Sequence, residues 1–332
     1  VWRTVVQWSD DKLAEKIRED QIDILVDMSG HTAGDRLKVF ARHPAPVQMT
    51  WMGYPGTTGL KSMDYRIEEK YFFNPIPMEK QFIEKIVQIP YVSVFDGLIN
   101  EAFVKETPAL RNKYITFGSF NRLNKISKEV VDVWCGVLKA IPESRLILGA
   151  MPSNGLPSEL SEWFLENGVN WKERIFCYPR SGFLEYLKMH DQVDFCLDTF
   201  PYSGGTTTNH ALWMGVPTLT LTGDTYPSYQ SAYLLRRVGL DNIFATKSKQ
   251  EFLERAIQLS QNINLLNNIR MNLRDVLNDD YENQLKITVD GFSYAFKKIW
   301  KKWVQGSEPR KFQVLDEELG YQRSAKFSTL KL

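Results

Sequence analysis

The sequence predicts an α/β protein made of two Rossmann-like domains, of which the first is incomplete at its N-terminus. Continuous apolar runs such as Ile22–Met28 and Phe195–Leu197 have the length and composition of parallel strands covered on both faces, and segments with helical periodicity separate them. This alternation is typical of a parallel sheet with helices on its faces. A chain of 332 residues is also long for a single core, which favours two domains.

The first domain is expected to span residues 1–105. Its pattern is half of a doubly wound domain, without the strand and helix that should open it. The chain begins with Val rather than Met, so we expect that upstream sequence is missing. The predicted elements are helices Asp10–Asp20 and Asp35–Arg42 and strands Ile22–Met28, Val47–Met52 and Lys85–Pro90.

The second domain is expected to span residues 106–281, after a linker near Glu101–Asn112. Strands alternate there with short helices, which implies right-handed crossovers in a parallel sheet. Helix Glu282–Val304 is expected to cross back to the first domain, and Gln305–Leu332 to form a mobile tail because it shows little periodicity. The predicted elements of the domain are strands Tyr114–Ser119, Arg145–Ala150, Arg174–Tyr178, Asp194–Asp198 and Pro217–Leu221, and helices Lys128–Ala140, Ser158–Asn167, Phe183–Lys188, Thr207–Gly215, Lys249–Gln261 and Leu265–Asn278.

The segment Ser203–Pro217 (SGGTTTNHALWMGVP) predicts a phosphate site. It follows a buried strand, and its two glycines permit a tight turn and a close approach to a ligand. The N–H groups and the positive end of the helix dipole would attract an anion there, and the threonine hydroxyls add donors. The alternative is an ordinary strand-to-helix loop in which Thr206 caps the helix.

Three segments, in sequence order, resemble the O-GlcNAc transferase/SPINDLY family. They are His31–Gly59 (HTAGDRLKVFARHPAPVQMTWMGYPGTTG), Phe117–Ser127 (FGSFNRLNKIS), and Ser203–Pro217 with LDTFPY before it and TLTLTGDT after it. The resemblance implies a GT-B-like fold, in which two facing Rossmann-like domains bind ligands in the cleft between them. It also implies an inverting, metal-independent glycosyltransferase that moves a sugar, expected to be GlcNAc from UDP-GlcNAc, to Ser or Thr hydroxyls of acceptor proteins.

The resemblance assigns Lys125 and Arg122 to the departing diphosphate. Negative charge grows on that group during transfer, and a positive group aimed at it lowers the barrier by about several kcal/mol. The matching lysine of the family contacts the diphosphate and is essential, so Lys125 is the expected catalytic residue. Arg122 stands where glutamine is common and would hold a second phosphate oxygen. Without the resemblance, both would be interpreted as solvated loop charges.

The same resemblance assigns the phosphates to the start of the following helix. Thr206 and Thr207 should bind them as their counterparts do. Gly205 stands where some members carry histidine, and fits a closer approach of the backbone.

Three further residues are assigned to the nucleoside, each at a position where the match is weaker. His210 stands where an acidic residue often holds the ribose, and a packed helix histidine is the alternative. Tyr186 replaces a histidine that often stacks on the base, and an aromatic ring can still stack. The backbone of Ser181 would contact the base. These departures leave the nucleotide and the sugar open.

In the first domain, the turn after strand Val47–Met52 is expected on the sugar and acceptor side. Met52, Gly53 and Pro55 belong to this turn, whose glycines permit a backbone surface close to the ligands; a turn that only packs is the alternative. His31, in a Gly-rich loop after the preceding strand, is placed to face the cleft.

The catalytic base is not assigned. The histidine that the family favours lies upstream of the matched region, so the base is missing with that segment, is absent, or is replaced by His31. Asp27 and Asp35 are further options, although Asp35 fits better as an N-cap. His43, before Pro44, is expected at a helix end.

Composition excludes several function classes. With 41 Lys and Arg against 40 Asp and Glu, there is no basic excess for nucleic acid. No apolar run approaches the length of a membrane span. The three cysteines lack metal-ligand spacing and are expected as buried thiols in a reducing, cytoplasmic compartment. No Asp-x-Asp pair lies in the matched segments, so we expect no metal and no cofactor besides the donor substrate.

Two other functions stay open. The chain could be a nucleotide-sugar-binding protein or fragment that lacks transferase activity because its base segment is missing, or a GT-B-like enzyme of another class, such as an epimerase. Members of the family usually carry tetratricopeptide repeats before the catalytic region; no such period precedes Asp10. Some relatives use GDP-fucose and others glucosylate asparagine.

Overall fold

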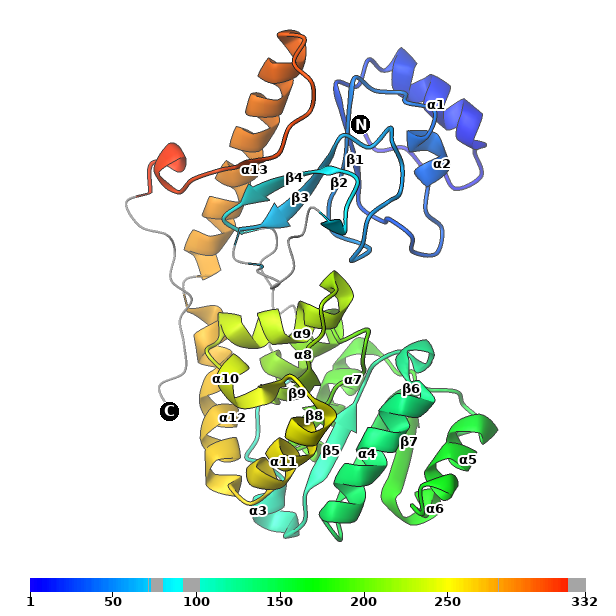
Figure 1. Cartoon of the computed structure of the whole chain (residues 1–332), viewed down its shortest axis with the longest axis vertical. Helices are drawn as coiled ribbons and strands as arrows, with labels where there is room; N and C mark the ends of the chain where they lie inside the picture. Colours follow the sequence, from blue (N-terminus) through cyan, green and yellow to red (C-terminus); the bar gives the residue numbers. More distant parts are fainter. Residues whose placement is uncertain (71, 73–79, 92–101, 280, 322–332) are drawn as a thin grey trace. The chain divides into compact units, whose positions relative to one another are not determined.

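The computed structural model describes residues 1–70, 72, 80–91, 102–279 and 281–321. Among these, the described residues up to 91 and residues 281–321 belong to one compact unit, and residues 102–279 belong to another. Each unit is built around its own parallel sheet (Figure 1).

The first unit contains a five-stranded sheet in the order β1-β2-β3-β4-β11, with every neighbouring pair parallel. Helix α13 packs against β4 and contributes Ala295 and Ile299 to the core of this sheet (Figure 1). The elements of the unit are α1 (Asp10–Glu19), β1 (Ile24–Asp27), α2 (Leu37–Phe40), β2 (Val47–Thr50), β3 (Tyr65–Glu69), β4 (Lys85–Ile89), α13 (Tyr281–Val304), β11 (Phe312–Gln313) and a 3-10 turn at Glu317–Leu319.

Strand β3, which the sequence analysis does not predict, buries three charged side chains. Arg66, Glu68 and Glu69 are each 2% exposed. The Arg66 guanidinium forms an ion pair with Glu68 and donates to the carbonyl oxygens of Gly56 (2.9 Å) and Tyr54 (3.3 Å). A run with this many charges resembles an exposed segment, and only such pairing permits its burial.

The segment after α13 is held by the first sheet, in contrast to the mobile tail that the sequence predicts. Strand β11 pairs with β4, with Phe312 opposite Val87, and Val314 is fully buried. Lys70 also forms an ion pair with Asp316 at 3.0 Å. The predicted tail from residue 322 onward lies outside the described residues.

The second unit contains a six-stranded parallel sheet in the order β10-β9-β8-β5-β6-β7. Its first strand, β5, lies inside the sheet. The chain winds from β5 through β6 and β7 toward one edge and then from β8 through β9 and β10 toward the other, which is the doubly wound order. The strands are β5 (Thr116–Ser119), β6 (Arg145–Met151), β7 (Ile175–Pro179), β8 (Phe195–Leu197), β9 (Thr218–Leu221) and β10 (Ala245–Thr246).

The helices of this unit begin and end close to the predicted positions. Ser127 and Ser248 accept hydrogen bonds from backbone N–H groups in the first turns of α4 and α11, and so fix where these helices start. The sequence analysis omits α9, α10 and the short α6, and places a linker over α3. The helices are α3 (Ala109–Asn112), α4 (Lys128–Ala140), α5 (Ser158–Glu166), α6 (Trp171–Arg174), α7 (Phe183–Met189), α8 (Thr206–Trp213), α9 (Tyr226–Arg237), α10 (Asp241–Phe244), α11 (Lys249–Ser260) and α12 (Ile263–Asn278), with 3-10 turns at Leu123–Lys125 and His190–Gln192.

The attachment of the segment after α13 can be tested at two neighbouring residues. Val314 is fully buried and Leu315 is 43% exposed. We expect Val314→Ala to lower the free energy of unfolding by about 2 kcal/mol, because it leaves a cavity in the core of the first sheet. Leu315→Ala should change it by less than about 0.5 kcal/mol. Urea unfolding followed by circular dichroism measures both, and equal effects would contradict the packing described.

Candidate functional site

The predicted phosphate loop lies at the point where the strand order of the second sheet reverses. Strands β5 and β8 are parallel neighbours, so their carboxyl ends lie side by side. The chain leaves β5 toward β6 on one side and leaves β8 toward β9 on the other, and such a reversal is where open α/β sheets bind their ligands. The loop after β5 carries Lys125, and the loop after β8 leads through Gly204 into α8.

The buried carboxylate of Asp198 organises both loops. Its Oδ1 accepts hydrogen bonds from the backbone N–H groups of Thr199 (2.9 Å) and Gly204 (2.8 Å) and from the Asn121 side chain (3.1 Å). Its Oδ2 accepts from the Thr220 hydroxyl at 2.7 Å. Burial raises the pKa of Asp198, and these hydrogen bonds oppose the shift. The carboxylate thus fixes the turn after β8 and connects it to β5 and β9.

The turn also depends on the absence of a side chain at Gly204. A Cβ atom at this position would lie 2.2 Å from the Thr208 hydroxyl oxygen. That hydroxyl is 2.8 Å from the Ser231 hydroxyl of α9, which itself donates to the Gly204 carbonyl oxygen at 3.0 Å. Ser231 of α9 therefore holds both the turn and the Thr208 hydroxyl in place, and no larger residue fits at position 204.

Lys125 reaches from the β5 loop to the turn after β8. Its ammonium donates to the Ser203 carbonyl oxygen at 2.8 Å and lies 3.7 Å from the centre of the Tyr202 ring. Burial lowers the pKa of Lys125 to about 8; the negative charge of Asp198 opposes this shift and the positive charge of Arg122 adds to it. An ammonium of this kind gains from a nearby anion, because the anion replaces lost hydration.

The N-terminus of α8 lies at the end of the same turn. Gly205 is the N-cap and Thr206 is the first helical residue, so Thr206 does not cap the helix as the alternative supposed. The first four N–H groups of a helix have no acceptor within it, and the N-cap of α8 is a glycine, which has no side chain to accept from them. Thr206 is exposed, and the Thr207 hydroxyl donates to Asn121 Oδ1 at 2.8 Å.

His210 and Tyr186 lie in one aromatic cluster. His210 Nδ1 is 3.2 Å from the Tyr186 hydroxyl, and their ring centres are 5.4 Å apart in an edge-to-face arrangement. Phe183 packs against His210 at 5.1 Å. Burial lowers the pKa of His210 to about 4 and raises the pKa of Tyr186. His210 is therefore neutral at pH 7 and packed, which agrees with the alternative interpretation of this histidine.

Two further predicted residues of the second unit, Arg122 and Ser181, are exposed. Arg122 precedes the 3-10 turn that carries Lys125, and Ser181 lies between β7 and α7. Arg122 acts on Lys125 through its charge. Sequence reasoning did not select Asn121 and Tyr202, although both lie in matched segments directly beside residues that it named.

In the first unit, the predicted residues lie in the loops after β1 and β2, two parallel neighbours. The exposed His31 ring packs edge-to-face against Tyr54, with ring centres 5.4 Å apart. Gly30 and Gly53 both have positive φ, and a Cβ on either would lie 2.6 Å from an atom of the opposite loop. His31 and the Met52–Gly53 turn therefore lie close together. Gly30 and Gly53 permit this contact, because a larger residue at either position would overlap the opposite loop.

The buried carboxylate of Glu84 holds the end of the turn after β2. Glu84 accepts a hydrogen bond from the Thr58 N–H at 2.7 Å and from the Thr57 hydroxyl at 2.8 Å. Met52 is exposed with a φ of 58°, whereas Pro55 is buried. Met52 and Gly53 are therefore open to a ligand, and Pro55 is a packing residue in this unit.

The two aspartates named as options for a base are used by the backbone. Asp27 is buried and accepts from the Gly30 N–H (3.0 Å), the Ser29 N–H (3.1 Å) and the Thr50 hydroxyl (2.8 Å). Asp35 accepts from the Leu37 N–H at 3.1 Å, but the N-cap of α2 is Arg36, so Asp35 lies one residue before the cap position that the sequence analysis gave it. His31 is the remaining option among those named.

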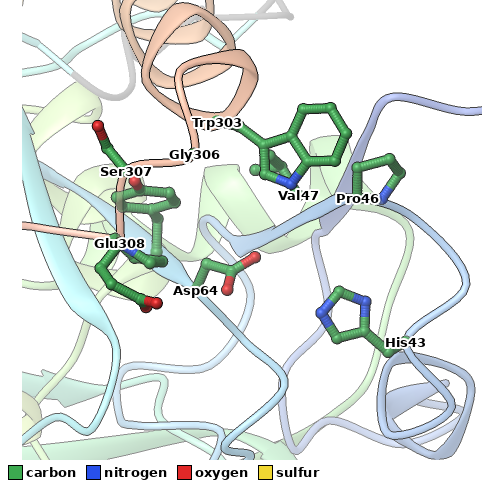
Figure 2. A pocket seen from close by; sticks show the side chains of 10 residues that line it. His43, Pro46, Val47, Asp64, Trp303, Gly306, Ser307 and Glu308 are labelled. Carbon is green, nitrogen blue, oxygen red and sulfur yellow. The ribbon is translucent and has the colours of Figure 1, made fainter.

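A cavity of about 430 Å³ lies elsewhere in the first unit, where β2 and β3 begin (Figure 2). Its lining includes His43, Asp64 and Trp303, none of which belongs to the predicted site. Figure 2 shows the His43 ring and the Asp64 carboxylate on its wall. Ligands of doubly wound sheets bind at the carboxyl ends of strands. This cavity lies at the amino ends and is separate from the predicted site.

In the described part of the chain, no group of three or more His, Cys, Asp or Glu side chains could hold a metal ion. No helix among the described residues is long and apolar enough to cross a membrane.

The chain matches the model of glycosyl transferase family 41 over residues 6–106 and 102–284. It is 36% identical over 325 residues to the probable UDP-N-acetylglucosamine--peptide N-acetylglucosaminyltransferase SPINDLY of Arabidopsis thaliana, and 35% identical over 328 residues to the protein of the same name from Oryza sativa subsp. japonica. Both alignments cover 96% of this chain and 35% of the relative. The chain thus spans about a third of the length of these relatives.

Two solved structures of glycosyltransferases are similar to this chain in fold. A mutant O-GlcNAc transferase of Thermobaculum terrenum superposes with a TM-score of 0.80 at 32% identity, over 92% of this chain and 58% of that one. The lipopolysaccharide outer core galactosyltransferase WaaB in its apo form has a TM-score of 0.52 at 13% identity, over 86% and 79% of the two chains, and is similar in fold alone. The predicted GT-B-like fold of two parallel-sheet domains is confirmed.

Close packing at the turn after β8 gives a test. We expect Gly204→Ala to lower the free energy of unfolding of the second unit by about 2 kcal/mol, because its Cβ would overlap the Thr208 hydroxyl. Gly136→Ala is the control: it lies within α4 with no atom within 4 Å of the new Cβ, and should raise stability by up to about 1 kcal/mol. Adding Thr208→Ala should recover part of the loss; purely additive losses in urea unfolding would refute the overlap.

Proposed function

The chain belongs to glycosyl transferase family 41, and on that premise we propose that it transfers N-acetylglucosamine from UDP-GlcNAc to Ser or Thr hydroxyls of proteins, with inversion and without a metal ion. The names of the SPINDLY relatives, which state a UDP-N-acetylglucosamine donor and a peptide acceptor, support the donor and the class of acceptor.

The observation that carries the proposal is the meeting of Lys125 with the turn that starts α8. The Lys125 ammonium bonds to the Ser203 carbonyl oxygen, two residues before the N-cap of α8. A diphosphate at this turn would therefore meet a positive side chain and the positive end of a helix together. Both lie at the reversal of strand order, where open α/β sheets bind nucleotides.

In the proposed reaction, the acceptor hydroxyl oxygen forms a bond to the anomeric carbon on the face opposite the leaving group. The bond from that carbon to the diphosphate oxygen breaks, and the nucleoside diphosphate leaves with the electron pair. The hydroxyl proton passes to a base, for which His31 is the candidate. Lys125 and the α8 N–H groups stabilise the charge of the leaving group, a task that a divalent cation performs in other enzymes.

The runner-up function is nucleotide-sugar binding without transfer. Two of the three residues named as possible bases favour it: the carboxylates of Asp27 and Asp35 accept hydrogen bonds from backbone N–H groups. His31 is then the remaining named candidate for a base. Isothermal titration with UDP and GDP, together with assays of UDP release from UDP-GlcNAc with and without acceptor peptides, separates the two. Tight UDP binding with no turnover would favour the runner-up.

Lys125→Met tests the role of the ammonium, because methionine keeps most of the side-chain length without the charge. We expect UDP release to fall by about 100-fold or more, the effect of removing one group that stabilises transition-state charge. Lys128→Met is the matched control: its ammonium is half exposed and pairs with Glu166 at 2.8 Å, an interaction worth at most about 1 kcal/mol. Retained activity in Lys125→Met, with both variants folded, would contradict the assignment.

The pKa of Lys125 predicts how UDP affinity varies with pH. The free ammonium loses its proton near pH 8, and a bound diphosphate raises this pKa, so binding above pH 8 requires proton uptake. UDP affinity should fall by about tenfold between pH 7 and pH 9, since about nine-tenths of the free lysine is neutral at pH 9. Titration calorimetry at several pH values measures this. Lys125→Met should lose the dependence; an unchanged pH profile in that variant would assign it to another group.

A further inference from the structure

The cavity at the amino ends of β2 and β3 has the size of a binding site for a small molecule. Its volume of about 430 Å³ lies in the range of pockets that hold such ligands. Val47 and Tyr65, the first residues of the two strands, form part of its wall, and His43 and residues 306–309 contribute to the rest. All of its lining residues belong to the first unit, so the cavity is complete within that unit.

The way in which α13 ends brings a carboxylate to this cavity. Gly306 has a φ of 68°, and its N–H donates to the Trp303 carbonyl oxygen at 2.8 Å, while the Ser307 N–H donates to the Lys302 carbonyl oxygen at 3.0 Å. These two hydrogen bonds form a Schellman motif, which ends the helix and turns the chain back. Glu308 follows directly after this turn and lines the cavity.

Two carboxylates make the cavity negative. Burial raises the pKa of Asp64, and the negative charge of Glu308 adds to this shift, whereas the Gln48 N–H and the charge of His43 oppose it. The carboxylates of Asp64 and Glu308 therefore lie close enough to repel each other. Within the described part of the chain, neither of them has a Lys or Arg partner in an ion pair.

The Asp64 carboxylate is held in one orientation. Its Oδ2 accepts from the Gln48 N–H at 2.8 Å, and its Oδ1 accepts no hydrogen bond from a described residue. Figure 2 shows this carboxylate and the Trp303 indole on the wall of the cavity. The indole stacks on Trp300, with ring centres 4.8 Å apart, and is thereby fixed as well. An open carboxylate oxygen and an aromatic ring together suit a cation.

We propose that this cavity binds a small molecule that carries a protonated amine on an aromatic or apolar body. The ammonium lies between Asp64 and Glu308, and the body packs against Trp303. An organic cation fits better than a metal ion, because no group of three or more His, Cys, Asp or Glu side chains in the described residues could hold a metal. This second site does not depend on the proposed transferase activity.

Saturation-transfer NMR of the wild-type chain with phenethylamine tests the proposal. We expect binding at about millimolar concentration, which is typical of a ligand of this size. Phenethyl alcohol and phenylacetate keep the aromatic body without the positive charge, and each should bind about tenfold more weakly or worse. Equal binding of the alcohol, or no signal from phenethylamine, would overturn the proposal.

Three variants locate the bound amine. Glu308→Gln, at an exposed position, should weaken phenethylamine binding by about threefold. Asp64→Asn keeps an acceptor for the Gln48 N–H and should weaken it by about tenfold. Glu317→Gln is the matched control, because it removes an exposed charge that does not line the cavity, and binding should not change. If both cavity variants are folded by circular dichroism and bind as the wild type does, the proposal is wrong; an equal loss in Glu317→Gln would also contradict it.

A lysine side chain of another protein would offer the same ammonium on a narrower body. Nα-acetyl-lysine N-methylamide is the probe for this source. Tighter binding of phenethylamine than of the blocked lysine would support a free small molecule as the ligand. The reverse order would overturn that assignment in favour of a protein partner.

Discussion

The buried carboxylate of Asp198 is the constraint on which the candidate site of the second unit depends. A carboxylate without contact to water is strongly unfavourable unless donors surround it, so the backbone must adopt a course that brings donors to it. Its donors include two N–H groups of the turn after β8, the Asn121 side chain of the β5 loop and the Thr220 hydroxyl of β9. Satisfying this one charge therefore fixes the turn, joins three parallel strands at their carboxyl ends, and determines where α8 begins.

The position of Lys125 follows from the same arrangement. Its ammonium is drawn into a partly buried place by a carbonyl oxygen and an aromatic ring of the fixed turn, and burial shifts its pKa toward neutrality. At this site a positive group and a helix N-terminus converge, and the Asp198 carboxylate, which acts on Lys125 through its charge, already accepts hydrogen bonds from the turn. An anion that binds there would meet positive groups that are already in place. Such preorganised groups stabilise the charge of a leaving diphosphate, because they need not move during the reaction.

The sequence predicts those parts of the fold whose cause is local. Apolar runs and side-chain caps determine the strands and helices of the second unit. The turn from β8 into α8 could also be predicted from the Gly-Gly-Thr segment, because turn chemistry is local too. Strand β3 was missed because Arg66, Glu68 and Glu69 look exposed until their buried partners are known. The need for glycine at position 204 comes from Thr208 and from Ser231 of α9, a helix that the sequence analysis did not assign. The hydrogen bonds that join Asp198, Asn121 and Thr207 depend on the positions of individual atoms, which the spacing of residues in the sequence does not encode.

The first unit repeats the same arrangement, which bears on the choice of a base. Asp27 ends β1 as Asp198 follows β8, and each carboxylate accepts N–H groups from the turn that comes directly after it. An aspartate used in this way is an acceptor for the backbone and has no lone pair in a suitable place for an acceptor hydroxyl. Asp27 and Asp198 are therefore anchors for the loops that follow them. Among the residues named as possible bases, His31 differs from Asp27, because the loop after β1 leaves the His31 side chain exposed.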